Sequence, residues 1–327
     1  MSVDLDVVFL GTSGSTPTAR RAPSATLVRR GGERLLVDCA EGTQRQLLRS
    51  SVGLPDLDEI FLTHYHADHY LGLPGLLKTF SLRGREAPVA VYGPPGLEEL
   101  FGDLRRVMGK LAFGVRLAEL QPGDRLDRDG YALETFRLDH GVSAVGYALV
   151  EDERPGRFDD AAADELGVPF GPERGRLQRG EAVTLADGTT IAPDRLIGPA
   201  RGGRTIVLAG DTAPCEHVVA AAQGADVLVH EATFLDEDRD RARETRHSTA
   251  GEAAAVALAA GVKLLALTHL SARVFGSEAA GEAREVFPDT VVPKDFDVID
   301  VPFPERGPPE LLQGGAKGGR SVVSSES

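Results

Sequence analysis

One short segment constrains this chain more than any other: His64-Tyr65-His66-Ala67-Asp68-His69 follows directly on the apolar, strand-like run EIFLT. Neither a strand nor a helix can point three imidazoles and a carboxylate in one direction within six residues, so the spacing predicts a tight loop that gathers them. Imidazole nitrogens combined with a carboxylate oxygen are the usual ligands of catalytic zinc. A histidine-rich surface turn is the alternative, and the strand-like run before the loop disfavours it.

Three further candidate donors follow other apolar runs: His140 in RLDHGV, Asp211 in VLAGDT and His269 in ALTHLS. Each of them alone would more often be a hydrogen-bonded polar residue than a metal ligand. Added to the four donors of the loop, they make seven nitrogen and oxygen ligands. Seven are too many for one tetrahedral ion but suit two ions that share a bridging carboxylate and a bridging water.

Short runs rich in Val, Leu and Ile alternate with helix-like stretches along most of the chain. The runs lie at residues 5–11, 34–39, 59–64, 88–93, 205–211, 226–232 and 263–269, and the clearest helix patterns lie at 96–108 and 249–261. This order predicts an α/β fold in which helices flank buried strands. Several runs end in His or Asp, and ligands of layered α/β proteins gather where strands end, so we expect one shared site.

Composition narrows the class of protein. A chain of 327 residues, 42% of them hydrophobic, can bury a full-sized core. The acidic start MSVDLDVVFLG does not resemble a secretory signal, and no run approaches the roughly 20 apolar residues of a membrane-spanning helix. Cys39 and Cys215 could form one disulfide at most, so we expect a cytosolic protein with no membrane segment. The net charge of −14 means that any nucleic-acid surface must be a local basic patch.

Two stretches depart from the α/β pattern. Residues 150–204 are dense in Gly, Pro and charge, which predicts an insertion that projects from a main domain spanning residues 1–302. Residues 303–327, which contain ERGPPE, GGAKGG and SVVSSES, predict a disordered tail.

The donor loop and the later donors resemble the metallo-β-lactamase superfamily, whose signature is H-x-H-x-D-H followed by a distant His, Asp and His in that order. The resemblance implies an αβ/βα four-layer sandwich that holds two zinc ions per subunit. It assigns one zinc to His64, His66 and His140, the other to Asp68, His69 and His269, and makes Asp211 the bridge. Water between two such ions becomes hydroxide near neutral pH, and Asp68 would orient that water and accept its proton.

Further segments are similar to the ribonuclease Z family, which cuts precursor tRNA. The matching segments are YHADHYLGLPGLL at 65–77, HEATF at 230–234 and HST at 247–249. In that family the glutamate and the later histidine form a pair, which implies that Glu231 and His247 protonate the departing ribose 3′-oxygen. The alternative is that His247 merely adjoins Ser248, which would cap the next helix. We expect a structural role beside the site for His230, and an ordinary helix position for His217.

The loop after the first strand, residues 11–22, resembles the family's P-T-x-x-R-N loop, which senses nucleotides around the cleavage point. Pro17, Thr18 and Arg21 match this pattern, whereas Ala22 stands where asparagine is usual. Free backbone amides and a guanidinium group suit a phosphate, so the three matching residues are candidate substrate contacts. A plain turn between strands is the alternative.

Within the insertion, GVPFGP resembles the Gly/Pro signature of the family's flexible tRNA-binding arm. The resemblance makes candidate substrate contacts of Gly167, Pro169, Gly171, Pro172, Arg174, Arg176 and Arg179. An extended arm can measure tRNA shape through phosphate contacts, although acidic residues surround these arginines. A solvated linker is the alternative.

Together these resemblances imply a zinc-dependent endoribonuclease that hydrolyses the phosphodiester after the discriminator nucleotide of precursor tRNA. The products would be a tRNA 3′-hydroxyl and a trailer with a 5′-phosphate, made by a cytoplasmic homodimer in which one subunit's arm holds the tRNA that the other cuts. Two alternatives stay open from the residues: a zinc hydrolase of a small ester, and a metal-free scaffold that only binds a partner. Competent donors at every ligand position disfavour the scaffold. Removing the insertion tests the small-ester hydrolase.

Overall fold

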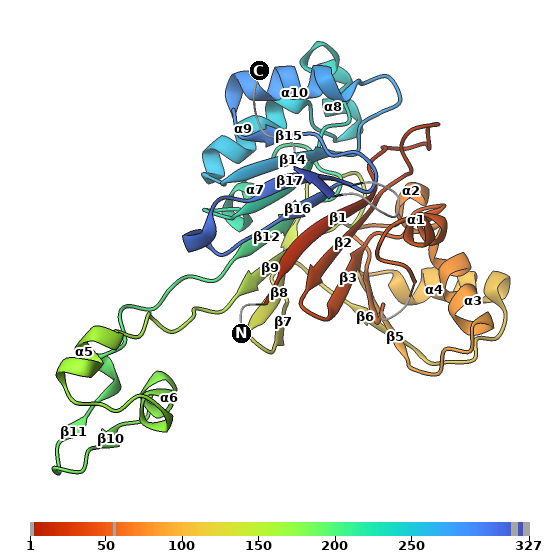
Figure 1. The fold of residues 1–327 in the computed structure, drawn as a ribbon. Helices are drawn as coiled ribbons and strands as arrows, with labels where there is room; N and C mark the ends of the chain where they lie inside the picture. Colours follow the sequence, from red (N-terminus) through yellow and green to blue (C-terminus); the bar gives the residue numbers. More distant parts are fainter. Residues whose placement is uncertain (1–2, 55–56, 315–319, 323–327) are drawn as a thin grey trace. The chain divides into compact units, whose positions relative to one another are not determined.

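The computed structural model describes residues 3–54, 57–314 and 320–322 (Figure 1). Backbone contacts divide the chain into two compact units. The body consists of Met1–Val150 and Arg204–Ser327, and the arm consists of Glu151–Gly203.

Two β-sheets form the centre of the body. Within the described residues, the first sheet has the strand order β18-β17-β16-β1-β2-β3-β4-β5-β6 and the second has the order β15-β14-β13-β12-β9-β8-β7. The first sheet contains β1 (Leu5–Gly11), β2 (Ala25–Arg30), β3 (Glu33–Val37), β4 (Glu59–Phe61), β5 (Val89–Gly93), β6 (Val115–Glu119), β16 (Val298–Asp300), β17 (Glu310–Gly314) and β18 (Arg320–Val322). The second contains β7 (Arg125–Arg128), β8 (Tyr131–Arg137), β9 (Val145–Glu151), β12 (Thr205–Leu208), β13 (Val227–Glu231), β14 (Leu264–Thr268) and β15 (Thr290–Val291).

The sheets pack face to face because their strands are apolar on both sides. In β1, Leu5, Val7 and Phe9 lie in the core between the sheets, whereas Val8 and Leu10 point to the outer helices. Such doubly buried strands read as continuous apolar runs, which is the pattern of the sequence.

Helices cover the outer face of each sheet (Figure 1). The core outside the first sheet contains side chains of α1 (Thr43–Arg49), α3 (Leu73–Leu82) and α4 (Leu97–Met108), and the core outside the second contains side chains of α7 (Glu216–Ala221), α9 (Ala250–Ala260) and α10 (Gly276–Val286). The short elements α2 (Ala67–Tyr70), η2 (Asp236–Asp238), α8 (Arg239–Thr245) and η3 (Pro304–Arg306) lie in connections. The αβ/βα four-layer sandwich predicted from the sequence is therefore confirmed.

The arm has a small apolar core of its own. Its elements are α5 (Asp160–Glu165), α6 (Pro172–Gln178), the hairpin β10 (Val183–Thr184) with β11 (Thr190–Ile191), and η1 (Pro193–Arg195). Its buried side chains are Ala163, Val168, Leu177, Val183, Ile191 and Leu196. The arm is thus a folded unit, and its part in binding tRNA stays a prediction.

The predicted disordered tail needs correction over much of its length. Phe303 is buried beneath the guanidinium of Arg204, which lies 3.9 Å from the centre of its ring. Further on, β17 pairs with β16, and Leu311 packs against the core between the sheets. The Gly/Pro-rich composition concealed a strand with its own apolar contacts. Residues 315–319 and 323–327 of the predicted tail lie outside the described residues. None of the described helices has the length and apolar character needed to cross a membrane.

Candidate metal centre

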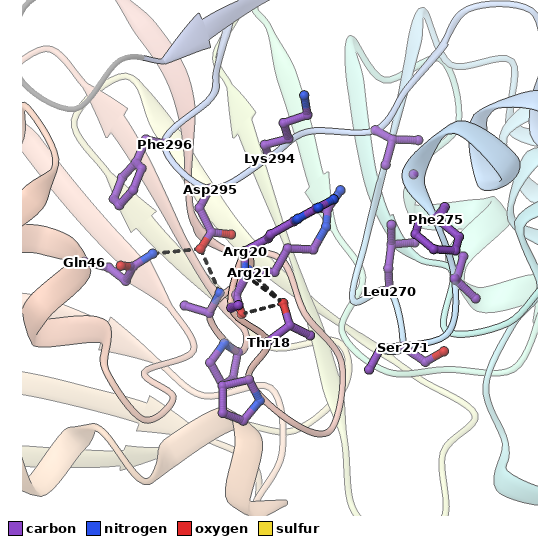
Figure 2. Close-up of a pocket in the computed structure, with 18 of the residues that line it drawn as sticks. Thr18, Arg20, Arg21, Gln46, Leu270, Ser271, Phe275, Lys294, Asp295 and Phe296 are labelled. Carbon is purple, nitrogen blue, oxygen red and sulfur yellow. Dashed lines mark hydrogen bonds between the residues drawn. The ribbon is translucent and has the colours of Figure 1, made fainter.

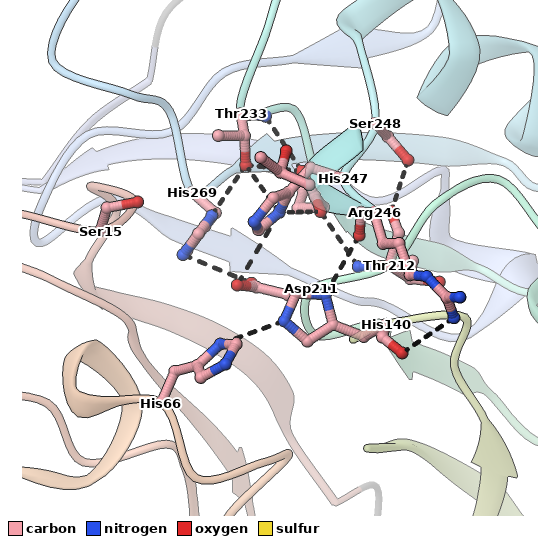
Figure 3. A network of polar contacts seen from close by, with 12 residues as sticks. Ser15, His66, His140, Asp211, Thr212, Thr233, Arg246, His247, Ser248 and His269 are labelled. Carbon is pink, nitrogen blue, oxygen red and sulfur yellow. Dashed lines mark hydrogen bonds and ion pairs between the residues drawn. The ribbon is translucent and has the colours of Figure 1, made fainter. Parts of the chain in front are cut away.

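The candidate metal donors stand where strands of the two sheets end. His64 lies shortly after β4, and His66 is the residue before the single turn of α2 that carries Asp68 and His69. His140, Asp211 and His269 follow β8, β12 and β14, so both sheets contribute to one cluster. Figure 3 shows His66, His140, Asp211 and His269 facing one another across the space between the sheets.

All seven predicted donors come together. One group has its ligand atoms within 4.8 Å of one another and consists of His64, His66, His140 and Asp211, and a second group meeting the same limit consists of Asp68, His69 and His269. The carboxylate of Asp211 also faces the second group, because its Oδ2 lies 3.3 Å from His69 Nε2 and its Oδ1 lies 3.3 Å from His269 Nε2. Six of the donors are buried or half-buried, whereas His66 is exposed and faces the solvent side.

The residues present fit a divalent cation. His69 Nε2 is buried and makes no hydrogen bond within the described residues, although buried polar atoms are normally satisfied. A cation held by this nitrogen and the carboxylate of Asp211 would satisfy it. The full set of imidazole and carboxylate donors is also the chemistry that zinc and similar ions take.

Most of the converging imidazoles are held through their second nitrogen. His64 Nδ1 lies 3.1 Å from Thr63 Oγ1, His140 Nδ1 lies 3.1 Å from the carbonyl oxygen of Arg246, and His269 Nδ1 lies 3.0 Å from Thr233 Oγ1. Such contacts fix the ring orientation and the tautomer of a metal ligand.

Asp38 is the strongest of these outer contacts, and sequence reasoning missed it. Its Oδ2 lies 2.7 Å from His69 Nδ1, and its Oδ1 accepts a hydrogen bond of 2.9 Å from the backbone N–H of Thr63. Burial opposes the protonation of His69, but the charges of Asp211 and Asp38 on either side of the ring outweigh it. The pKa of His69 is therefore raised well above its usual value. The signal that could have identified Asp38 is a carboxylate directly after the buried run of β3, the same placement as that of Asp211 after β12.

Asp68 is held as a carboxylate beside the other donors. Its Oδ2 accepts a hydrogen bond of 2.8 Å from the backbone N–H of Ser15 and lies 3.3 Å from His269 Nε2. Burial opposes ionisation, but the contact with His269 and the charge of His69 hold the pKa of Asp68 below its usual range. Asp68 is therefore available as a ligand or as a proton acceptor.

Glu231 and His247 form the predicted pair beside the donors. His247 Nδ1 lies 2.6 Å from Glu231 Oε1, and the backbone N–H groups of Thr212 and Thr233 donate to the same carboxylate. Burial of His247 opposes its protonation, but the charge of Glu231 outweighs this and raises the pKa of His247 to about 9. The ring of His247 stacks on that of His269, with centroids 5.7 Å apart, which places the pair directly against the cluster.

The structure also bears on three other expectations, those for Ser248, His230 and His217. Thr249, and not Ser248, is the residue that caps α9, because its side chain accepts a hydrogen bond from the N–H of Glu252 in a capping box. Ser248 instead donates to the carbonyl oxygen of Thr212. His230 is buried beside the backbone of Glu231 and is no member of the donor groups, and His217 is exposed on α7.

The predicted substrate loop lies against the cluster, but its arginine is engaged elsewhere. Gly14 allows the loop to approach His269 so closely that a Cβ at this position would lie 2.6 Å from the carbonyl oxygen of His269. Arg21 Nη1 donates to Thr12 Oγ1 and to the carbonyl oxygen of Pro293, both at 2.7 Å. Thr18 Oγ1 accepts from the N–H of Arg21, and Pro17 is exposed. Arg21 therefore stabilises the loop, and the exposed cation of this segment is Arg20.

The arm arginines differ from one another in the same way. Arg174 is buried, donates to the carbonyl oxygen of Val168, and forms ion pairs with Asp160 and Asp164. The expectation of a free RNA-binding cation at this position needs correction, because the guanidinium ties the arm's own helices together. Arg176 and Arg179 are exposed, and both pair with Glu181.

The Gly/Pro segment of the arm shapes its turns. Gly167 and Gly171 have positive φ angles of 73° and 139°, which favour glycine, and Pro172 occupies the start of α6. Pro169 precedes Phe170, whose side chain is 90% exposed. An aromatic ring that the small core leaves uncovered is the most accessible apolar group of this segment.

Backbone strain gathers around the donors. Ser15, Asp38, Arg246 and His269 have φ angles between 56° and 60°, a region that non-glycine residues rarely adopt. All four contact the site directly or through one hydrogen bond. Residues held in this way mark functional sites, because only a strongly determined surrounding structure maintains them.

Comparison with known proteins agrees with this geometry. Residues 33–270 match the family described as the beta-lactamase superfamily domain. The chain is 48% identical over 309 residues to a ribonuclease Z of Halorubrum lacusprofundi, covering 93% of this chain and 99% of that relative. It is 47% identical over 305 residues to a ribonuclease Z of Myxococcus xanthus, covering 92% and 99%. Among solved structures, the short form of human tRNase Z matches with a TM-score of 0.67 and 29% identity, covering 91% of this chain and 99% of that one.

Proposed function

The chain belongs to the ribonuclease Z family of the beta-lactamase superfamily, and on this basis we propose how its residues cut RNA. It is a hydrolytic endoribonuclease that processes the 3′ ends of tRNA. The observation that carries the mechanism is the meeting of seven metal donors with the pair Glu231–His247.

We propose that two zinc ions bind in this cluster. His64, His66 and His140 would hold one ion, Asp68, His69 and His269 would hold the other, and Asp211 would contact both. Bound zinc lowers the pKa of water toward neutrality and neutralises charge on a phosphoryl group. The donor groups support this count, because Asp211 belongs to the first group and directs its carboxylate toward the second.

Asp68 is the proposed general base. Its carboxylate stays ionised, and the N–H of Ser15 fixes one of its oxygens. In this position it orients the attacking water and accepts its proton, while Ser15 prevents the carboxylate from turning away.

His247 is the proposed general acid for the leaving oxygen. The charge of Glu231 stabilises the imidazolium, and the hydrogen bond from Nδ1 to Glu231 leaves Nε2 as the atom that gives up the proton. Protonation of the ribose 3′-oxygen leaves a 3′-hydroxyl on the tRNA and a 5′-phosphate on the trailer, with the cut after the discriminator nucleotide.

The arm is the proposed tRNA grip of a homodimer in the cytoplasm, in which the arm of one subunit holds the tRNA that the other cuts. Its separate core and its exposed Phe170 support a role as a distinct binding unit. Gly167, Pro169, Gly171 and Pro172 would shape the contact surface, and Arg176 and Arg179 would exchange their pairing with Glu181 for phosphate contacts.

The direct test is incubation of the zinc-loaded protein with a precursor tRNA that carries a 3′ trailer. We expect one cut after the discriminator by the parent and by Asp103→Ala, which removes an exposed carboxylate on α4. Asp68→Ala should give no product within the same assay, and the trailer from the parent reaction should carry a 5′-phosphate. Equal cleavage by Asp68→Ala and the parent would remove Asp68 from the mechanism.

A further inference from the structure

A large cavity opens in the body next to the metal donors (Figure 2). Its volume is about 1130 Å³, and its walls come from the loop Pro17–Pro23, from α1, from the segment after His269, from α10 and from the stretch Val291–Phe296. Pockets for a single small molecule measure roughly 300–1,000 Å³. This cavity therefore has room for a ligand longer than one nucleotide.

The cavity is basic although the chain is acidic. Its walls carry six cationic side chains, Arg20, Arg21, Arg45, Arg49, Arg284 and Lys294, against the two carboxylates of Glu41 and Asp295. The whole chain has a net charge of −14. A local excess of cations in an acidic protein indicates a ligand that carries several negative charges.

One of the two carboxylates, that of Asp295, is hydrogen-bonded to other residues of the cavity wall. Asp295 accepts hydrogen bonds from the side chains of Thr12 and Gln46 and from the N–H of Ala22, at distances of 2.7 to 2.8 Å. Arg21 completes this network through Thr12. Figure 2 shows the contacts of Asp295 with Gln46 and with the loop that carries Arg20 and Arg21. These bonds hold the loop in place and leave other cations to face a ligand.

Three cations remain available to such a ligand. Arg20, Arg45 and Lys294 are exposed, and within the described residues no hydrogen bond or ion pair engages their side chains. Two aromatic rings lie among them, because Phe275 is 62% exposed and Phe296 also lines the cavity. Free cations interleaved with accessible rings are the chemistry that binds a single-stranded nucleic acid, whose phosphates pair with the cations and whose bases stack.

The cavity adjoins the metal donors. Its walls begin beside Asp68 and His269, because the loop that donates Ser15 N–H to Asp68 continues at Pro17 and Leu270 follows His269 directly. Figure 3 shows Ser15 of this loop beside His269. The acceptor stem of a tRNA is double-stranded, so the single-stranded RNA that leaves the cut is the trailer, and free cations with accessible rings suit that part of the substrate.

We propose that this cavity binds the phosphate backbone of the RNA segment 3′ of the cut, the trailer, through Arg20, Arg45 and Lys294. This inference rests on the function proposed above, since a trailer is present only when the protein cuts precursor tRNA at the metal donors. Arg21, which the sequence suggested as a substrate contact, is a residue of the wall.

The test compares Arg20→Gln/Lys294→Gln with a matched control, Arg105→Gln/Arg106→Gln, which removes two exposed cations of α4. Two precursor tRNAs are used, one with a single-nucleotide trailer and one with a trailer of about eight nucleotides. The parent and the control should have a lower KM for the long trailer than for the short one. In the cavity variant the long-trailer KM should rise toward the short-trailer value, while the short-trailer KM stays unchanged.

Binding of a 5′-phosphorylated trailer oligonucleotide, measured by fluorescence anisotropy at several salt concentrations, gives a second readout. Losing two phosphate contacts should reduce the slope of log Kd against log salt by about 1.4, at about 0.7 per contact for a single strand. The proposal would be overturned if the cavity variant kept both the parent's ratio of long-trailer to short-trailer KM and the parent's salt slope. An equal rise of KM for both precursors would also overturn it, because it would place tRNA itself in the cavity. Failure of the parent to cut either precursor would count against the proposed function instead, and the oligonucleotide slope would still report on the cavity.

Discussion

Four imidazoles of the metal cluster have a partner at their second nitrogen, and these partners are of three kinds. His140 is held by a backbone carbonyl, His64 and His269 by threonine hydroxyls, and His69 by the carboxylate of Asp38. Only the last partner carries a charge. A carboxylate strengthens the imidazole as a ligand and fixes its orientation more firmly than a neutral oxygen can.

Asp38→Asn should therefore weaken metal binding while leaving the fold intact. The amide oxygen can still accept from His69 Nδ1, but the negative charge behind the ring is lost. We expect the affinity for zinc at the site that contains His69 to fall by about 10- to 100-fold, measured by competition with a chromogenic chelator. Asp103→Asn on the exposed face of α4 is the control. Parent-like affinity in Asp38→Asn would mean that the contact only orients the ring.

At the scale of single residues, the sequence predicted the donors better than their surroundings. His64, Asp211 and His269 could be found because each follows an apolar run, and this placement can be read directly from the sequence. The roles of Asp38, Arg21 and Arg174 depend on partners that are distant in the sequence or on burial, which composition and spacing do not reveal. A charged residue that looks free in a sequence can be fully engaged once the chain folds.

The helix α9 fixes the position of the segment His247–Ser248 that precedes it. Thr249 and Glu252 form the capping box at its start, and Thr249 Oγ1 also contacts the carboxylate of Asp236. The helix is rich in alanine, and the buried faces of Ala253 and Ala257 allow it to pack closely on the second sheet. The cap therefore connects the stability of a core helix to the placement of His247.

Thr249→Ala should destabilise the protein by about 1 kcal/mol, because the N–H of Glu252 loses its acceptor at the helix start. The measurement is thermal or urea unfolding of the metal-free protein, which separates this effect from zinc binding. Ser277→Ala is the matched control, since that exposed hydroxyl in the first turn of α10 makes no hydrogen bond within the described residues. Equal stability of the two variants would show that Glu252 finds another partner.

Elements of ordinary length were predictable, and very short ones were not. The central strands and α4 and α9 have the apolar periodicity that their burial requires. The strands of the arm's hairpin, β10 and β11, have two residues each, and β17 has only two apolar residues, so none of them shows a period. They form by pairing with a partner strand, β10 with β11 and β17 with β16, which the pattern of the segment alone does not identify.

The charge of the whole molecule is divided unevenly, which favours the local binding of RNA proposed above. The cavity beside the donors has more cations than carboxylates, whereas Arg176 and Arg179, two exposed arginines of the arm, are paired with Glu181. Substrate binding is therefore expected to rely on local contacts rather than on the overall field of the protein.

Replacing Glu151–Gly203 with a short turn that contains Asn-Gly should separate RNA binding from chemistry. The body keeps every donor, so zinc content and hydrolysis of a small activated phosphodiester should match the parent. Binding of precursor tRNA would lose one of the two proposed contact regions, and we expect KM to rise by about 100-fold or more. Steady-state kinetics on both substrates gives the comparison. Undiminished cleavage of precursor tRNA would favour a solvated linker as the role of this segment.

The two ends of the arm have a consequence for how such an enzyme can change over generations. Val150 and Thr205 are direct partners in the antiparallel pairing of β9 with β12, so the chain leaves the body and returns to it at neighbouring positions. A segment inserted there can lengthen, shorten or be exchanged for another without moving any strand of the sandwich. Selection for new RNA partners can thus proceed at this junction while the hydrolytic centre is inherited unaltered.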